Sequence, residues 1–322
     1  MPSFSVSGLS MRNASALTFF HLTGLSHMTP RLRVLVFAVT LLCYAAILLV
    51  NGLLIVTIVL EKKLHEPMYY FVCNLCVNGL YGTVAFFPKF LYDLLSESHV
   101  VSYVGCLLQV FVIYSYAASE IANLAVMAYD RYVAITRPLE YHAVMTKRRA
   151  LMLVSFSRVV PMLCQAVVTG MTSRLELCGS HIGKLYCENW SLLQLSCEPV
   201  TINSVVGFAN IVFYFGHDLF IMCSYVQLVK IAFRSKDGKK KFTQTCVPHL
   251  LSLFNISVAL LFDLMYARYG TSSVPRSLRN FMAIQILAFP PLLNPVIYGM
   301  KLSKIRGRIL QYFTRKRAFE LR

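Results

Sequence analysis

Seven long apolar segments constrain this 322-residue chain more than any other feature of its sequence. They lie near residues 33–60, 67–95, 103–136, 148–172, 200–233, 243–268 and 277–299. A helix rises about 1.5 Å per residue, so about 20 apolar residues cross the ~30 Å hydrocarbon core of a bilayer. Only 14% of the residues are charged, whereas soluble proteins carry roughly 25%. We therefore expect an all-α membrane protein, a bundle of seven transmembrane helices.

The basic residues between the segments indicate the orientation of the bundle. Nineteen Lys and Arg residues lie on the side that holds Asp130 and Arg131, and eight lie on the side of the N-terminus. Because cytoplasmic loops carry the excess of Lys and Arg, the N-terminus should be extracellular. We expect an extracellular N-terminus (1–32), the bundle (33–299), and a cytoplasmic amphipathic helix with a tail (300–322) that contacts anionic lipids.

The charge and the motifs exclude two broad classes of function. The formal net charge of +17 would suit a nucleic acid partner, but the basic residues cluster between apolar segments without interleaved aromatic residues. The sequence contains no P-loop, zinc-binding spacing or nucleophile elbow, so we expect neither an enzyme nor a cofactor. Asn13-Ala14-Ser15 is a glycosylation acceptor triplet, although such triplets also arise by chance.

The third segment ends in an acid–base pair that needs a reason inside a membrane protein. Residues 127–135 read Met-Ala-Tyr-Asp-Arg-Tyr-Val-Ala-Ile, which places Asp130, Arg131 and Tyr132 together. Cys106 precedes Arg131 by 25 residues, about 37 Å along a helix and slightly more than the hydrocarbon core. One helix therefore carries a cysteine at one membrane face and the Asp-Arg-Tyr string at the other.

This pattern resembles the third helix of rhodopsin-like G-protein-coupled receptors, and the nine-residue string resembles their olfactory receptor branch. Further strings typical of this branch occur elsewhere in the chain, at residues 64–71, 241–250 and 291–299. The string Asn-Gly-Leu-Tyr-Gly at residues 78–82 resembles fish-type olfactory receptors, which points to water-soluble odorants. The resemblance implies an odorant receptor in the plasma membrane of olfactory neuron cilia, which raises cyclic AMP through a stimulatory G protein.

Two other functions are alternatives to an odorant receptor. The chain could be a rhodopsin-like receptor for an endogenous ligand outside the nose. A small-solute transporter is disfavoured, because transporters usually contain internal repeats with matched broken helices and none is visible here.

The resemblance also implies a set of switch residues at the cytoplasmic end. Asp130 would hold Arg131 at rest and release it toward the G protein on activation; the alternative is an arginine that merely reaches the membrane surface. Tyr225 and Tyr298 would point toward Arg131, unless they are simple interfacial aromatics. The remaining switch residues that the resemblance supplies are Tyr132, His249, Asn294 and Pro295, and His249 could equally be a packed histidine.

Four cysteines fall where an oxidising compartment reaches them. The even spacing of Cys178, Cys187 and Cys197 resembles the olfactory pattern, in which the middle cysteine is joined to the third helix. The resemblance implies the pairs Cys106–Cys187 and Cys178–Cys197.

The chain departs from the family pattern at a sodium site. Gly79 stands where rhodopsin-like receptors usually carry an aspartate, while Glu120 fits a second acid common in olfactory receptors. A sodium ion at Glu120 is one expectation, and a protonated, uncharged carboxyl group is the alternative.

We expect the ligand cavity in the outer half of the bundle, with a basic anchor. In receptors of this kind that bind small carboxylates, a basic residue occupies the position of Arg268, so we predict an acidic or zwitterionic odorant. The competing anchors are Lys89, which could pair with Asp93 four residues on, and the loop residues His181 and Lys184. Further expected lining residues are Asp263, whose pairing with Arg268 is disfavoured by their five-residue offset, and four residues whose alternative role is helix packing: Val110, Ile113, Tyr114 and Ala117.

One arginine, Arg158, falls in the middle of the fourth segment. Inserting a charge at this depth is unfavourable by roughly 2.5–3.5 kcal/mol, so a partner is expected. Asp218 in the neighbouring fifth segment is one candidate for this partner.

Overall fold

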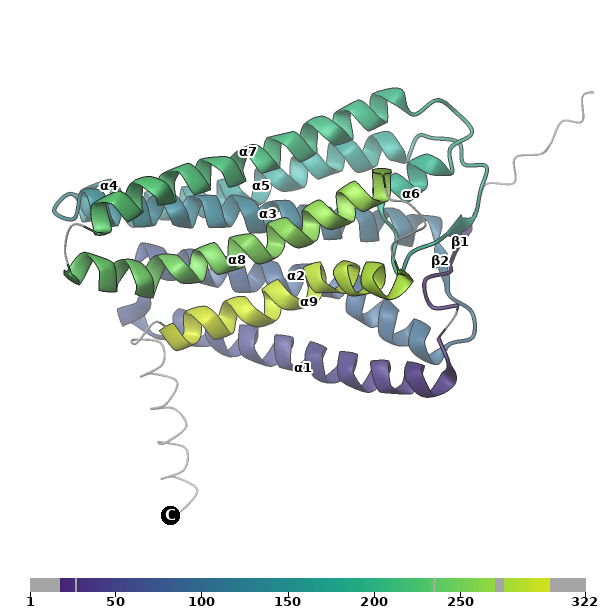
Figure 1. Ribbon diagram of the computed structural model, residues 1–322, viewed down its shortest axis with the longest axis horizontal. Helices are drawn as coiled ribbons and strands as arrows, with labels where there is room; N and C mark the ends of the chain where they lie inside the picture. The colour runs from purple at the N-terminus through teal and green to yellow at the C-terminus, as the bar shows by residue number, and fades with distance from the viewer. Residues whose placement is uncertain (1–17, 27, 234–235, 270–274, 302–322) are drawn as a thin grey trace, which may run out of the picture.

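The computed structural model describes residues 18–26, 28–233, 236–269 and 275–301, and it confirms the seven-helix bundle (Figure 1). Seven helices of this described part are long and apolar enough to cross a membrane. They are α1 (Pro30–Leu60), α2 (Pro67–Leu95), α3 (Tyr103–Thr136), α5 (Lys147–Thr172), α7 (Thr201–Ala232), α8 (Lys236–Tyr269) and α9 (Arg276–Lys301).

Shorter elements close the two ends of the bundle. At one end lie α6 (Asn189–Gln194) and a three-stranded sheet, ordered β2-β1-β3, with β1 (Phe19–Leu22) between β2 (Val100–Ser102) and β3 (His181–Ile182) (Figure 1). At the other end lie η1 (Lys62–Leu64) and α4 (Tyr141–Val144). The sequence did not predict this sheet, because its strands are too short to show a periodic pattern.

The helix ends follow local sequence signals. Thr29, Ser102 and Thr146 are N-cap residues whose hydroxyl oxygens accept hydrogen bonds from backbone N–H groups of α1, α3 and α5. The largest departure from the predicted segments is α8, which begins at Lys236 rather than near residue 243. The extra turns are polar residues that continue the helix beyond its apolar part.

The third transmembrane helix, α3, lies at the centre of the bundle. It contacts α2, α5, α7 and α8. Of the most apolar stretch of α3, 61% is buried, against 11% for α1 and for α7, which face the lipid. Because α3 runs through the centre of the bundle, it carries predicted ligand residues near one end and the Asp130–Arg131 pair near the other.

Prolines in α9 free backbone carbonyls that other helices then bind. Pro295 has no N–H for the carbonyl of Pro291, which instead accepts a hydrogen bond of 2.7 Å from Nδ2 of Asn51 on α1. Pro290 likewise frees the carbonyl of Ile286, which accepts a hydrogen bond of 3.2 Å from the hydroxyl of Tyr116 on α3. These two bonds attach α9 to its neighbours at the depth where lipid would satisfy neither carbonyl.

Two expectations lie outside the described residues. These are glycosylation at Asn13 and the cytoplasmic amphipathic helix with its tail at residues 300–322, of which only the first two residues are described.

Candidate functional site

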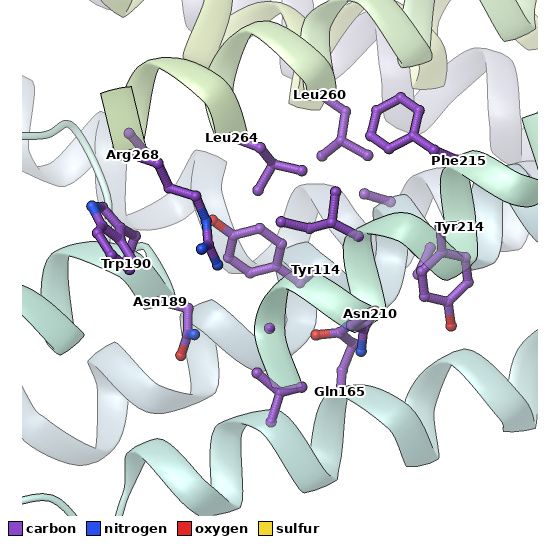
Figure 2. A pocket seen from close by; sticks show the side chains of 16 residues that line it. Tyr114, Gln165, Asn189, Trp190, Asn210, Tyr214, Phe215, Leu260, Leu264 and Arg268 are labelled. Atoms are coloured by element: carbon purple, nitrogen blue, oxygen red, sulfur yellow. The ribbon is translucent and has the colours of Figure 1, made fainter. Parts of the chain in front are cut away.

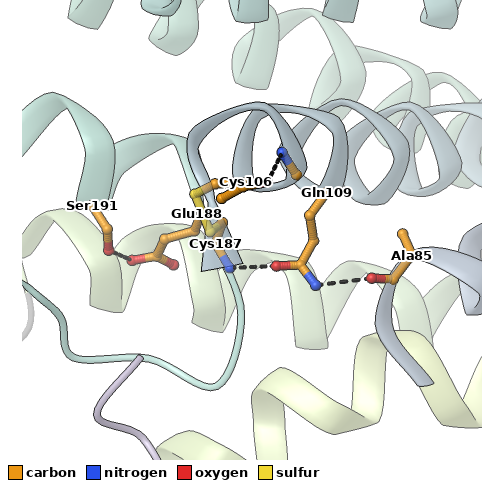
Figure 3. Close-up of a disulfide and its surroundings, with 8 residues drawn as sticks. Ala85, Cys106, Gln109, Cys187, Glu188 and Ser191 are labelled. Atoms are coloured by element: carbon orange, nitrogen blue, oxygen red, sulfur yellow. Dashed lines mark hydrogen bonds between the residues drawn. A yellow bond between two sulfur atoms is a disulfide. The ribbon is translucent and has the colours of Figure 1, made fainter. Parts of the chain in front are cut away.

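Two disulfides hold the loop between α5 and α7 over the end of the bundle that carries the sheet. Cys106 at the start of α3 is joined to Cys187, and Cys178 is joined to Cys197, the two pairs that the resemblance implied. Gln109 adds a polar bridge: its Oε1 accepts from the backbone N–H of Cys187, and its Nε2 donates to the carbonyl of Ala85, each at 2.8 Å (Figure 3). The loop is thus attached to both α2 and α3.

A cavity lies beneath this loop, between α3, α5, α7 and α8. Figure 2 shows Tyr114, Trp190 and Arg268 directed toward one another at one side of it, with Gln165 and Asn210 at another. The amides of Gln165 and Asn210 are joined by a hydrogen bond of 3.1 Å. The lining residues are Tyr114, Ala117, Ala118, Gln165, Val168, Asn189, Trp190, Gly207, Asn210, Ile211, Tyr214, Phe215, Leu260, Leu264, Ala267 and Arg268.

Arg268 reaches this cavity from the end of α8. Its guanidinium carbon lies 4.7 Å from the ring centroid of Trp190 and 5.9 Å from that of Phe208, so aromatic faces stabilise the cation. Its Nη1 donates to Oγ of Ser204 at 3.3 Å. A Cβ on Gly207 would lie 3.3 Å from Nη2, so the glycine leaves the guanidinium its space.

Only two of the four residues predicted on α3 line the cavity. Tyr114 and Ala117 do so. Val110 instead packs in a cluster with Cys106 and Cys187 under the loop, and Ile113 packs in the main core. The disulfide covers α3 at Val110, and Ile113 faces the core of the bundle, so both side chains meet protein rather than open space.

The other basic candidates are already paired. Lys89 forms an ion pair with Asp93. Nζ of Lys184 lies 2.9 Å from Glu188 and 3.6 Å from Asp263. Asp263 also accepts from the hydroxyl of Tyr186 at 3.4 Å, so it joins α8 to the loop and does not line the cavity where it was expected.

The two loop residues of this group, Lys184 and Glu188, have shifted pKa values. Burial raises the pKa of Glu188 to about 7; the negative charge of Asp263 acts in the same direction, and Lys184 opposes them. For Lys184, burial alone would lower the pKa, but the carboxylates of Glu188 and Asp263 outweigh it and raise the pKa. His181, the last competing anchor, is exposed and stacks on His21 at 5.2 Å.

The opposite end of the bundle holds the Asp130–Arg131 pair. The guanidinium of Arg131 binds Oδ2 of Asp130, with Nε at 3.0 Å. Oδ1 of Asp130 accepts a further hydrogen bond of 2.7 Å from the hydroxyl of Tyr141 on α4. Both oxygens of Asp130 are thus engaged, and its side chain is only 1% exposed.

Other predicted switch residues gather around this pair. Tyr225, His249 and Tyr298 are buried and lie within electrostatic reach of Arg131. The rings of His249 and Tyr298 meet edge to face at 5.3 Å. Within the described residues, both ring nitrogens of His249 lack a hydrogen-bond partner, as does the hydroxyl of Tyr225. Tyr132 is half-buried against the core, at the margin of this group.

Deeper in the bundle lie Glu120, Asn294 and Pro295. Arg158 is directed toward this group and not toward Asp218. Asn294 donates to Oε1 of Glu120 at 2.5 Å. Arg158 points toward α2, where Nη1 donates to Oδ1 of Asn78 at 2.5 Å. Asp218 accepts instead from Ser257 of α8 at 3.0 Å. The candidate Arg158–Asp218 pair is therefore not formed, because equal depth in adjacent helices does not fix which way a side chain points.

Sequence reasoning identified Tyr114, Ala117 and Arg268 and missed the rest of the lining, of which Trp190, Gln165 and Asn210 matter most for polarity and shape. Trp190 carried a signal, since it is the one tryptophan of the chain and lies three residues after Cys187. The two amides carried none, because a polar residue in an apolar segment does not reveal its partner.

The fold and site define a seven-helix membrane receptor, with a cavity covered by the disulfide-bonded loop at one end and a buried acid–base pair at the opposite end. The olfactory receptor family model matches residues 40–316. Olfactory receptor 5AP2 of Mus musculus is 35% identical over 306 residues, 94% of this chain and 95% of that protein. Olfactory receptor 13D1 of Homo sapiens is 33% identical over 308 residues, 94% and 88% of the two chains.

This chain belongs to the olfactory receptor family. It is an odorant receptor, a multi-pass protein of the plasma membrane that couples to a G protein and cyclic AMP, and it is not an enzyme. Family membership decides against the transporter.

Proposed function

We propose that this receptor detects small, water-soluble odorants that carry a carboxylate, alone or within a zwitterion, and binds that carboxylate with Arg268. The observation that carries the proposal is a half-buried guanidinium that lines the cavity with no carboxylate within ion-pair distance in the described part of the chain. A buried charge is unfavourable unless it is paired. A carboxylate ligand would supply the missing charge through two parallel hydrogen bonds.

The pairing of the other basic residues supports this choice of anchor. Lys89 is neutralised by Asp93, and Lys184 by Glu188 and Asp263. A ligand carboxylate at either lysine would have to displace an existing ion pair, whereas at Arg268 it displaces only the neutral hydroxyl of Ser204. The gain on binding is therefore larger at Arg268.

The rest of the cavity sets the size and polarity of the odorant. The cavity volume is ≈ 70 Å³. A single water needs about 10–15 Å³ when volume is measured in the same way, so the cavity suits a ligand of several non-hydrogen atoms. Tyr114, Leu260 and Leu264 supply apolar surface, while Gln165 and Asn210 offer amide groups to a hydroxyl or amine on the ligand. A small acid with one further polar group fits this lining, in line with the fish-type resemblance.

The two ends of the bundle then face different compartments. Both disulfides lie at the end with the sheet and α6, and disulfides persist in an oxidising compartment. We place this end, with residues 1–32 and a glycosylated Asn13, outside the cell, in the cilia of olfactory neurons. The Asp130–Arg131 end then meets a stimulatory G protein in the cytoplasm, beside a tail at residues 300–322 that contacts anionic lipids.

A cyclic AMP reporter in cells that express the receptor tests the proposal. The panel contains ligands of one carbon skeleton that end in a carboxylate, an amino acid group, an amine, an alcohol or a methyl ester. We expect the carboxylate and amino acid members to activate at the lowest concentrations, and Arg131→Ala, at matched surface level, to abolish the response. Activation by amines or neutral members alone would contradict the proposed ligand class.

A further inference from the structure

A chain of polar side chains, all buried except the half-buried Arg158, joins four helices at the centre of the bundle. Nδ2 of Asn78 on α2 donates to Oε2 of Glu120 on α3 at 2.7 Å, and Nδ2 of Asn294 on α9 donates to Oε1 at 2.5 Å. Arg158 on α5 completes the chain through its bond to Oδ1 of Asn78. Glu120 and Asn78 are each 1% exposed and Asn294 is 4% exposed, so water does not screen these groups.

This arrangement places a fixed positive charge near a buried acid. Asn78 uses its two ends at once, with the amide on the carboxylate and the carbonyl oxygen on the guanidinium. The guanidinium carbon of Arg158 also lies 5.6 Å from the ring centroid of Tyr81, a further favourable contact for a cation in a membrane helix. The charges of Glu120 and Arg158 therefore compensate each other across one side chain.

The same residues fit a sodium ion poorly. A hard cation binds to several oxygens at once. Here both oxygens of Glu120 already accept amide hydrogens, and the carbonyl oxygen of Asn78 faces a guanidinium. The described residues contain no group of three or more His, Cys, Asp or Glu that could hold a metal ion. An ion beside Glu120 would also be repelled by Arg158.

The position of the second family acid is tight as well. A Cβ on Gly79 would lie 3.1 Å from Cβ and 3.3 Å from Cα of Pro291, so an aspartate here would require α9 to shift. Two neutral oxygens have no hydrogen-bond partner among the described residues: Oδ1 of Asn51, 3.5 Å from this Cβ, and Oδ1 of Asn294, whose amide nitrogen binds Glu120. Water can satisfy them without adding a second cation next to Arg158.

We infer that the guanidinium of Arg158 takes the place of a sodium ion as the positive charge that compensates Glu120, so that this receptor is insensitive to sodium. Glu120 is then linked to helices α2, α5 and α9 by the protein alone. The inference does not depend on which odorant binds, because it concerns the receptor without ligand.

Thermal unfolding of the purified, ligand-free receptor tests it, with sodium itself as the probe. The midpoint is compared in about 0.15 M sodium chloride and in the same concentration of choline chloride, a salt level that keeps ionic screening equal. An ion that binds only the folded state raises the midpoint. We expect the same midpoint in both salts, and a rise specific to sodium would overturn the inference.

A second measurement tests the charge compensation itself. Arg158→Gln and Glu120→Gln should each lower the midpoint, because each leaves the opposite charge buried without compensation. The double variant should lose less than the sum of the two single losses, since neither charge then remains. Arg148→Gln, at an exposed arginine of the same helix, should leave the midpoint unchanged.

Additive losses in the double variant, or an Arg158→Gln midpoint equal to that of Arg148→Gln, would show that the two charges are not coupled. If a single variant yields little folded receptor, the recovered yield of the double variant answers the same question. A failure here leaves the ligand proposal intact, because neither measurement involves Arg268.

Discussion

Gly82 on α2 lies directly against the ring of Tyr116 on α3: a Cβ at Gly82 would be 2.3 Å from Cγ of the tyrosine. The ring cannot move aside, because it is fully buried and its hydroxyl is bound to the carbonyl of Ile286. The glycine therefore sets how closely α2 and α3 approach at the depth of the central polar chain.

Gly82→Ala should destabilise the receptor. Alanine favours a helix by about 1 kcal/mol over glycine, but overpacking a buried contact costs about 1–3 kcal/mol, so the net change should be a lower unfolding midpoint. Gly52→Ala is the matched control, because a Cβ there meets nothing within 4 Å. The control should keep or raise the midpoint; equal behaviour of the two variants would show that the close approach is unimportant.

Tyr141 should help Asp130 to keep the receptor inactive. Tyr141→Phe removes the hydrogen bond to Oδ1 of Asp130. A hydrogen bond to a charged group contributes about 1.5–3 kcal/mol, so basal cyclic AMP should rise by about tenfold or more. Tyr129→Phe, which removes a hydroxyl bound to Arg149 instead, should leave basal cyclic AMP unchanged.

The pair itself gives the stronger test of the switch. Asp130→Asn should raise basal signalling further than Tyr141→Phe, because it removes the charge that holds Arg131. Arg131→Ala should abolish agonist-driven cyclic AMP. Surface level is measured alongside, and a well-expressed Arg131→Ala receptor with a normal response would refute the proposed role of the pair.

The two disulfides should differ in their effect on stability. Cys106 and Cys187 are separated by 81 residues, and Cys178 and Cys197 by 19. On the chain-entropy account, the longer loop contributes about 4.5 kcal/mol and the shorter one about 3 kcal/mol. Replacing the first pair by serines should lower the midpoint more than replacing the second, and should also release the loop above the cavity. The reverse order would mean that loop entropy is not the main contribution.

The buried carboxyl of Glu188 should make the outer end of the receptor pH-dependent. Burial raises its pKa to about 7, from an ordinary value of 4.5. Between these two values the folded receptor holds a proton that the unfolded chain has released, so stability should fall as pH rises through this window. Glu188→Gln removes this titration and should flatten the midpoint over the same range. Glu176→Gln, at an exposed loop acid, should keep the slope of the original receptor.

Much of the fold was predictable because it depends on length and depth alone. The ends of α2 and α3 coincide with the predicted segments, since an apolar segment must match the membrane. The pairing of Asp130 with Arg131 followed from adjacency. Side-chain direction was not available in this way: Val110 proved to be packed, and Arg158 faced α2 rather than α7.

The loop over the cavity was the least predictable part. Its cysteine pairs followed from a resemblance, but the contact of Trp190 with Arg268 depends on how the covalently closed loop folds back over the bundle. No periodic pattern encodes such a contact, because irregular segments take their shape from the surface they cover.

The most direct test of the central claim compares one odorant acid with its methyl ester on the receptor and on Arg268→Ala and Arg268→Lys. Removing a buried charge-assisted contact should cost about 2–5 kcal/mol, so Arg268→Ala should weaken the response to the acid by about 30-fold or more and leave the ester unchanged. Arg268→Lys should recover only part of this loss, because lysine cannot form two parallel hydrogen bonds. Arg174→Ala, at an exposed loop arginine, is the control. The half-maximal concentrations of the acid and the ester are measured from the cyclic AMP dose-response, and the difference between them should be lost in Arg268→Ala. Equal potency of acid and ester on the original receptor, or an unchanged difference in Arg268→Ala, would contradict the account.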